Sequence, residues 1–171
     1  ASQYCDFSYE NTLQILHQKY PHSNIYIVRP SHKSMEISLY GEYLDCDSDG
    51  NVKSYNPHGN AAHTLYLLLE NYICNDPGSS LPVILMGFSR GGLVLNQILI
   101  EMGTAVYSDS IMQRVQEIHW LDCGNGVRGM CYPNIENKPA SFLRYYNKSL
   151  RVFFHITSYL YGEIGRAHVW T

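Results

Sequence analysis

The sequence has little of several features that mark specialised classes of protein. Lys, Arg, Asp and Glu make up only 16% of its 171 residues and the formal net charge is −3, so no surface for nucleic acid is predicted. No apolar run approaches the roughly 20 residues of a membrane-spanning helix. The five cysteines are scattered and never spaced as C-x-x-C, which argues against a disulfide framework or a zinc site and favours a reducing compartment. The length fits one domain with a real core.

The most informative stretch runs over residues 81–95. An apolar, strand-like run leads into Gly87-x-Ser89-x-Gly91, and a helix-like run follows at once. This is the nucleophile elbow G-x-S-x-G in its expected context of strand, sharp turn and helix. Gly87 and Gly91 fit because side chains two positions from the serine would meet neighbouring backbone. At a helix start, free N–H groups stabilise an oxyanion, and the N–H of Arg90 is the donor that an elbow supplies.

Predicted helices and strands alternate along the chain. The alternation indicates an α/β fold with a mainly parallel sheet covered by helices on both faces. Ligands of such sheets bind beyond the carboxyl ends of the strands, where both Ser89 and Asp122 are expected. The polar span 31–59 is predicted to be loop. Helices are predicted at 9–20, 61–73, from Ser89 to Met102, at 109–114 and at 141–148, and strands at 24–29, 81–86, 117–122 and 150–159.

A working triad also needs an acid and a histidine, in that order after the serine. Asp122 is the candidate acid because it closes the strand after the nucleophile helix; a residue near Glu163 is the alternative, and Asp122 fits a turn cap equally well. No histidine is a convincing base. His119 and His155 lie within predicted strands, where a packed or hydrogen-bonded role is typical, although His155 is kept as a minor alternative. His168 follows Glu163 too closely, and the other histidines precede the serine.

The elbow and four further segments resemble one protein family. They lie at 8–11, 21–28, 87–99, 120–122 and 155–159. Over residues 3–162 the chain is similar to the family named after chromosome 2 open reading frame 69, except that Ser158 stands where the family tends to have proline. The resemblance implies an α/β-hydrolase-like fold, Ser89 as nucleophile, an aspartate in place of Glu163 and a mitochondrial location; the family's activity is poorly characterised. It also implies an earlier strand with a Phe-Pro-Gly-Asp turn and a longer C-terminal part, neither found in this sequence.

The two ends of the sequence are unusual. The chain begins at Ala1 without a methionine, and residues 163–171 resemble one reading frame of a sequencing-library adapter. We therefore expect residues 1–162 to form a single partial α/β-hydrolase-like domain, and 163–171 to be a non-native tail. A fragment of this kind, without a triad histidine, is expected to be inactive.

The sequence predicts a serine hydrolase that acts on an ester, thioester or amide through Ser89. The alternative is a non-catalytic binding or scaffold protein that keeps the fold. The substrate is a small molecule or acyl compound that no residue identifies, and a protein partner is compatible with either hypothesis. Neither a cofactor nor a metal is expected. The run from Asp45 to Gly50 resembles the start of an EF-hand loop, but Asn56 stands where that loop needs a glutamate.

Overall fold

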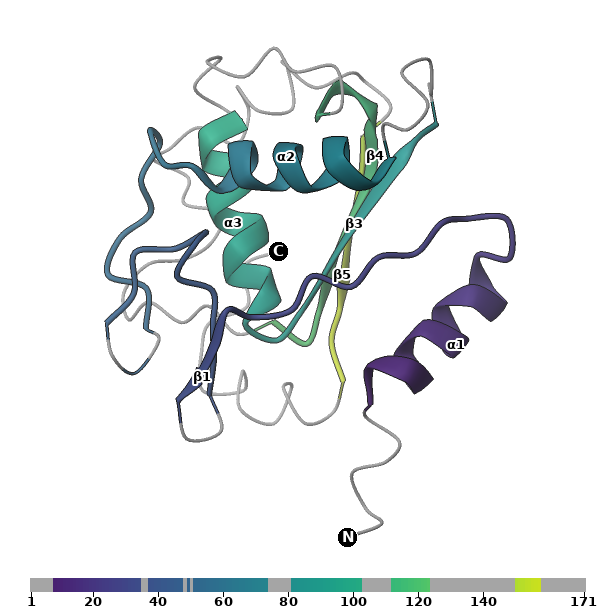
Figure 1. The fold of residues 1–171 in the computed structure, drawn as a ribbon, viewed down its shortest axis with the longest axis horizontal. Coiled ribbons are helices and arrows are strands. Elements are labelled where there is room, and N and C mark those ends of the chain that lie inside the picture. Colours follow the sequence, from purple (N-terminus) through teal and green to yellow (C-terminus); the bar gives the residue numbers. More distant parts are fainter. Residues whose placement is uncertain are drawn as a thin grey trace, which may run out of the picture. The chain divides into compact units, whose positions relative to one another are not determined.

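The computed structural model describes residues 8–34, 37–47, 49, 51–73, 81–102, 112–123 and 150–157 (Figure 1). The chain divides into two compact units, Ala1–Pro30 and Ser31–Thr171. The predicted helix at 109–114 is described only from Met112, where a 3₁₀ turn spans Met112–Arg114. The predicted helix at 141–148 and the suspected tail at 163–171 lie outside the described residues.

The first unit contains helix α1, Tyr9–Lys19. The hydroxyl of Ser8 caps it by accepting the N–H of Asn11 at 3.1 Å, and the helix ends just before Pro21, as predicted. The predicted strand at 24–29 is wrong, because these residues lie outside any helix or strand. Its β-branched and aromatic residues favour an extended chain, but the described part of this unit offers no neighbouring strand to pair with.

The second unit opens with a small antiparallel hairpin. Its strands are β1, His32–Ser34, and β2, Ile37–Leu39, and an isolated bridge pairs Cys46 with Val52 further on. This corrects the prediction of a loop throughout 31–59. Strands of three residues are too short to show the alternating pattern by which a strand is recognised in a sequence.

The main sheet has three parallel strands in the order β3-β4-β5. Helix α3 connects the first two strands and packs against β3, while helix α2 packs against α3. This arrangement confirms the α/β class and the parallel strand direction. The predicted helix at 61–73 is confirmed to the residue, and the three predicted strands are confirmed with shifted ends. The elements are α2, Ala61–Ile73; β3, Val83–Phe88; α3, Gly91–Met102; β4, Val115–Leu121; and β5, Arg151–His155.

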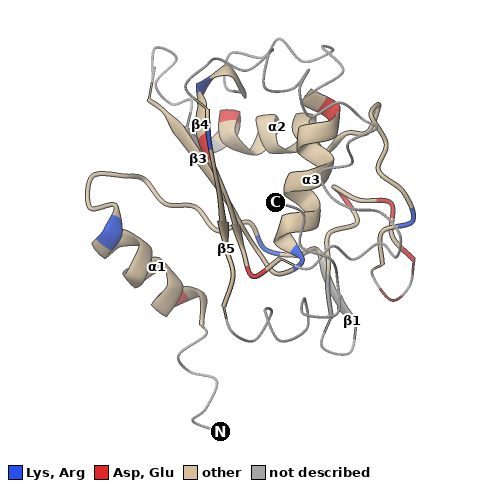
Figure 2. Ribbon diagram, turned by 180° about the vertical axis from the view of Figure 1, so that it is seen from behind, with Lys and Arg blue, Asp and Glu red and all other residues tan. Residues whose placement is uncertain are grey.

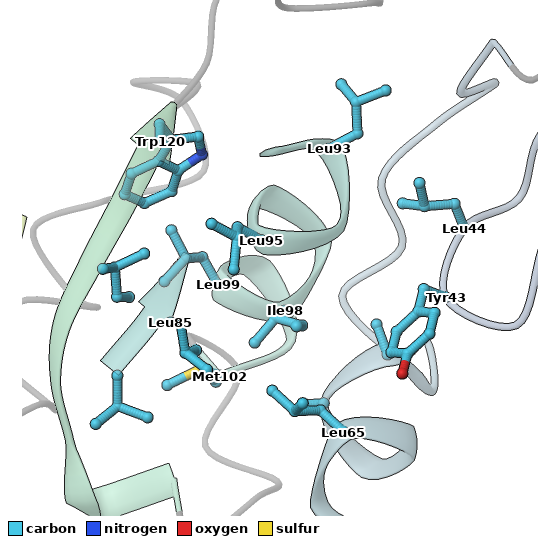
Figure 3. Packing of buried hydrophobic residues seen from close by; sticks show 14 of the residues in the cluster. Tyr43, Leu44, Leu65, Leu85, Leu93, Leu95, Ile98, Leu99, Met102 and Trp120 are labelled. Carbon is cyan, nitrogen blue, oxygen red and sulfur yellow. The ribbon is translucent and has the colours of Figure 1, made fainter. Parts of the chain in front are cut away.

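The hydrophobic core lies between the sheet and α3 and continues to α2 (Figure 3). Leu95 and Leu99 of α3 face Leu85 and Trp120 of the strands, and Leu65 of α2 lies on the other side of α3. Apolar burial on two sides of one helix explains why nine of its twelve residues are buried. Figure 2 shows the charged residues as isolated positions along the described ribbon: α1 carries both signs, whereas the charged residues of α2 and α3 are acidic.

Helix α3 also buries a polar side. Glu101 is completely buried and accepts the N–H groups of Ala61 at 3.0 Å and Ala62 at 2.7 Å, so it caps the start of α2. Gln97 exchanges two hydrogen bonds with the backbone of Asn56, at 2.6 and 3.0 Å. α3 therefore holds the loop before α2 as well as the sheet, which fixes the helix that begins at the elbow.

Candidate active site

Ser89 lies on a sharp turn between β3 and α3. Its φ is 50°, a left-handed value that non-glycine residues adopt only at a cost. Its N–H donates to the carbonyl of Leu121 at 2.9 Å, which extends the β3–β4 pairing by one residue. Its carbonyl then accepts the N–H of Gly92 at 3.1 Å and begins α3. The turn leaves Ser89 exposed just beyond the carboxyl end of β3.

Glycine is required at two places in this turn. A Cβ at Gly87 would lie 2.7 Å from both the carbonyl carbon and the oxygen of Gly91, and 2.7 Å from Cδ1 of Leu95. A Cβ at Gly92 would lie 2.3 Å from Sγ of Cys123. A Cβ at Gly91, by contrast, would face open space. The expected crowding therefore applies to Gly87 and not to the Gly91 side chain, and Gly92 is a requirement that the motif did not indicate.

Backbone N–H groups follow the serine at the start of α3. Those of Gly92 and Leu93 donate to the carbonyls of Ser89 and Arg90, each at 3.1 Å, and so belong to the first helical turn. The Arg90 N–H stays the predicted oxyanion donor. The Arg90 side chain is half-buried, and its charge acts on Cys46: burial raises the pKa of that thiol, and the nearby guanidinium partly opposes the rise.

Asp122 repeats the backbone pattern of Ser89 one strand further along the sheet. It follows β4 directly, its φ is 45°, and its N–H donates to the carbonyl of His155 at 2.8 Å. Its carboxylate accepts the N–H and the hydroxyl of Thr157 at 2.6 and 2.7 Å. Ser89 and Asp122 thus leave neighbouring strands at the same edge. The hydrogen bonds to Thr157 fit a strand-end cap, and the role of Asp122 as catalytic acid stays a prediction.

Cys123 packs beneath the elbow. Its thiol donates to the carbonyl of Gly87 at 3.0 Å and contacts the backbone of Gly92. Burial raises the pKa of this thiol to about 11 from an ordinary value of 9.0. Sequence reasoning missed Cys123, because its place beside the elbow depends on how β4 lies against β3.

The described histidines do not complete a triad. His119 lies within β4 and is buried, and its Nδ1 is 3.0 Å from Nε2 of His155 on β5. The prediction of a hydrogen-bonded role within strands is confirmed for both. Glu163 and His168 lie outside the described residues. The structure therefore brings Ser89 and Asp122 to one edge of the sheet, and it leaves the base unassigned.

The elbow lies within a sequence pattern shared by a whole family. The family model described as C2orf69 matches residues 1–81 and 74–170. The chain belongs to the C2orf69 family. This confirms the resemblance drawn from the five segments. No curated protein and no solved structure gives a significant match to the chain.

Elsewhere in this C2orf69 family member the described residues contain one notable hollow. It is open, has a volume of about 510 Å³, and is lined by residues of the 39–60 region together with Gln97. Ser89 is not among its lining residues. The hollow therefore does not include the candidate nucleophile, and we assign no substrate to it.

In the described ranges, no three His, Cys, Asp or Glu side chains come together in a way that could hold a metal ion. Of the helices described, none has both the length and the apolar character needed to cross a membrane.

Proposed function

We propose that the full-length protein is a serine hydrolase that transfers the acyl group of an ester, thioester or amide to Ser89. The φ of 50° at this serine, between a buried parallel strand and a buried helix, carries the proposal. Strained backbone persists only where the surrounding structure enforces it, and it clusters at active sites. The strand, turn and helix around Ser89 support an α/β-hydrolase-like fold. The alternation of helices and strands along the sequence supports helices on both faces of a larger sheet.

In this proposal the Ser89 hydroxyl oxygen attacks the carbonyl carbon while a histidine takes its proton. The carbonyl electrons move to oxygen, and the Arg90 N–H stabilises the resulting oxyanion. The intermediate then expels the leaving group, which receives the proton from the histidine, and water hydrolyses the acyl-enzyme by the same steps. Asp122 is assigned to orient the histidine from the end of the neighbouring strand.

The proposal is tested by labelling the full-length protein with a fluorophosphonate probe. We expect covalent labelling of the native protein and none of Ser89→Ala. The matched control is Ser23→Ala, which removes an exposed hydroxyl from the first unit and should leave labelling intact. Asp122→Asn should slow labelling by about a hundredfold or more if Asp122 orients the base.

A non-catalytic binding or scaffold role is the second candidate. It is favoured by Asp122, because both of its carboxylate oxygens accept hydrogen bonds from Thr157. In that case Asp122→Asn lowers stability, and a well-folded full-length protein takes up no probe. This result would contradict the hydrolase proposal.

The mitochondrial location is likewise proposed from family resemblance alone. Imaging of the full-length protein with a C-terminal fluorescent tag tests it, and diffuse staining outside mitochondria is the contrary result.

A further inference from the structure

A continuous chain of hydrogen-bonded side chains lies on the face of the sheet turned away from α3. Nε2 of His119 lies 3.0 Å from a carboxylate oxygen of Glu117, and its Nδ1 lies 3.0 Å from Nε2 of His155. The other oxygen of Glu117 pairs with Arg151. The His119 side chain is only 6% exposed and stacks on Phe153 with ring centroids 4.6 Å apart. The chain therefore joins β4 to β5 across the strand pair.

The geometry fixes where the protons lie. A carboxylate only accepts hydrogen bonds, so Nε2 of His119 carries a hydrogen. The neutral ring then has a lone pair on Nδ1, and His155 must donate to it from Nε2. Both tautomers are thereby determined. The remaining acceptor is Nδ1 of His155, whose residue is exposed, so the pair can take up one proton there without losing a hydrogen bond.

A second proton has a different effect. It must bind Nδ1 of His119, which turns the bond to His155 into a contact between two N–H groups of two cations, 3.0 Å apart and one of them buried. Two other charged groups on these strands face the pair: Glu117, already shared with Arg151, and Arg151 itself. From β3, the residue in register with His119 is the uncharged Met86. No described charge on the three strands is left to balance the second proton.

We propose that Glu117, His119 and His155 form a pH-sensitive latch that holds β5 in the sheet. β5 is an outer strand of the described sheet, and all five of its residues are exposed. It therefore depends on its pairing with β4 and on side-chain contacts across that strand pair, such as the stacking of Phe153 on His119. The latch opens as the pH falls, because the two rings keep their hydrogen bond only while at most one of them is cationic. The inference goes beyond the proposed function and does not depend on it.

Opening of β5 also releases Asp122. The N–H of this residue donates to the carbonyl of His155, and its carboxylate accepts both hydrogen bonds from Thr157. The Asp122 amide is therefore a direct reporter of the β4–β5 pairing. The Ser89 amide donates to Leu121 and reports the β3–β4 pairing, which contains no histidine pair.

Amide hydrogen exchange of the full chain, followed by NMR at pH 7.5 and 5.5 and corrected for intrinsic exchange, tests the latch. We expect the protection factor of the Asp122 amide to fall about tenfold more than that of the Ser89 amide. In His155→Gln this difference should shrink below about twofold, because a glutamine amide can donate to His119 and does not titrate. The matched control His63→Gln changes an exposed histidine on α2 and should preserve the wild-type difference.

Three results would overturn the latch: an equal fall at both amides in the wild type, an unchanged difference in His155→Gln, or its loss in His63→Gln. A measurement on the unmodified chain covers the case in which a variant does not fold. Long-range ¹H–¹⁵N spectra at pH 7.5 should show His119 with hydrogen on Nε2 and a bare Nδ1. The opposite tautomer contradicts the proposal.

Discussion

At the scale of single residues, the backbone strain is concentrated in two side-chain-bearing positions. Among the described residues other than glycine, Ser89 and Asp122 have positive φ, and both stand directly after a parallel strand. At Asp122 the cost of this backbone conformation is offset by two hydrogen bonds that the carboxylate accepts from Thr157. At Ser89 the strain holds an exposed hydroxyl at the end of a strand, which is why we connect it with function and not with stability.

The first prediction is that Ser89→Gly stabilises the protein by about 0.5–1 kcal/mol. Glycine adopts a φ of 50° without steric cost, although it loses more chain entropy on folding. Ser89→Ala keeps the strain and should not stabilise. Urea denaturation of both variants measures the difference, and equal stability of the two would mean that the turn is not strained at this residue.

A second prediction compares two glycines of the same motif. Gly87→Ala should cost roughly 1–3 kcal/mol, because the new methyl group would meet the backbone of Gly91 and must displace a buried strand or helix. Gly91→Ala places its methyl group in open space at the start of a helix. Its free energy of unfolding should therefore fall by no more than about 0.5 kcal/mol, or rise. Thermal melts of the pair decide; similar losses in both would contradict the crowding argument.

At the scale of elements, one buried carboxylate of α3, that of Glu101, holds the start of α2. The third prediction is that Glu101→Gln costs about 1–3 kcal/mol, because the neutral side chain offers one acceptor in place of two to the N–H groups of Ala61 and Ala62. The control Glu70→Gln alters an exposed glutamate of α2. Denaturant midpoints should fall for the first variant only, and exchange protection should drop at the first turn of α2.

Elements were predictable wherever the pattern was long. The helix at 61–73 shows its 3.6-residue period over three turns, and the strand before Ser89 is an unbroken apolar run. The strand predicted at 24–29 failed because propensity alone does not supply a pairing partner. The hairpin at 32–39 was missed because three-residue strands carry no period.

The site was predictable only in part for a related reason. The motif identifies Ser89, and the alternation of elements places Asp122 at the same edge of the sheet. The contacts of Asp122 with Thr157, of Cys123 with Gly92 and of His119 with His155 join residues that meet only after three strands align in register. No local pattern encodes such a register, so these contacts come from the structure alone.

At the scale of the whole molecule, the pKa shifts of four buried or half-buried groups act in one direction. Burial raises the pKa of Cys123 to about 11 and that of Tyr43 to about 12, and it also raises the pKa of Cys46 and Tyr55. Each folded-state pKa lies above the unfolded value, 9.0 for the thiols and 10.0 for the phenols, so the folded chain holds these protons more tightly. The contribution of these groups to the free energy of unfolding is fully present below about pH 9, and it is lost as the pH rises through their folded-state pKa values.

The last prediction follows from this sign. The melting temperature of the chain, kept under reductant, should be level up to pH 9 and fall between pH 9 and 11. Cys123→Ala starts from a lower stability, but its free energy of unfolding should decrease by about 1 kcal/mol less than that of the wild type over the same interval. The difference is no larger because water around the partly exposed thiol screens part of the effect. A wild-type melt that is flat to pH 10.5, or equal slopes in the two proteins, would show that the thiol beneath the elbow is not held in a protonated, buried state. Such a result would also weaken the packing assigned to Gly92, because the same sulfur atom fills the space that a side chain there would need.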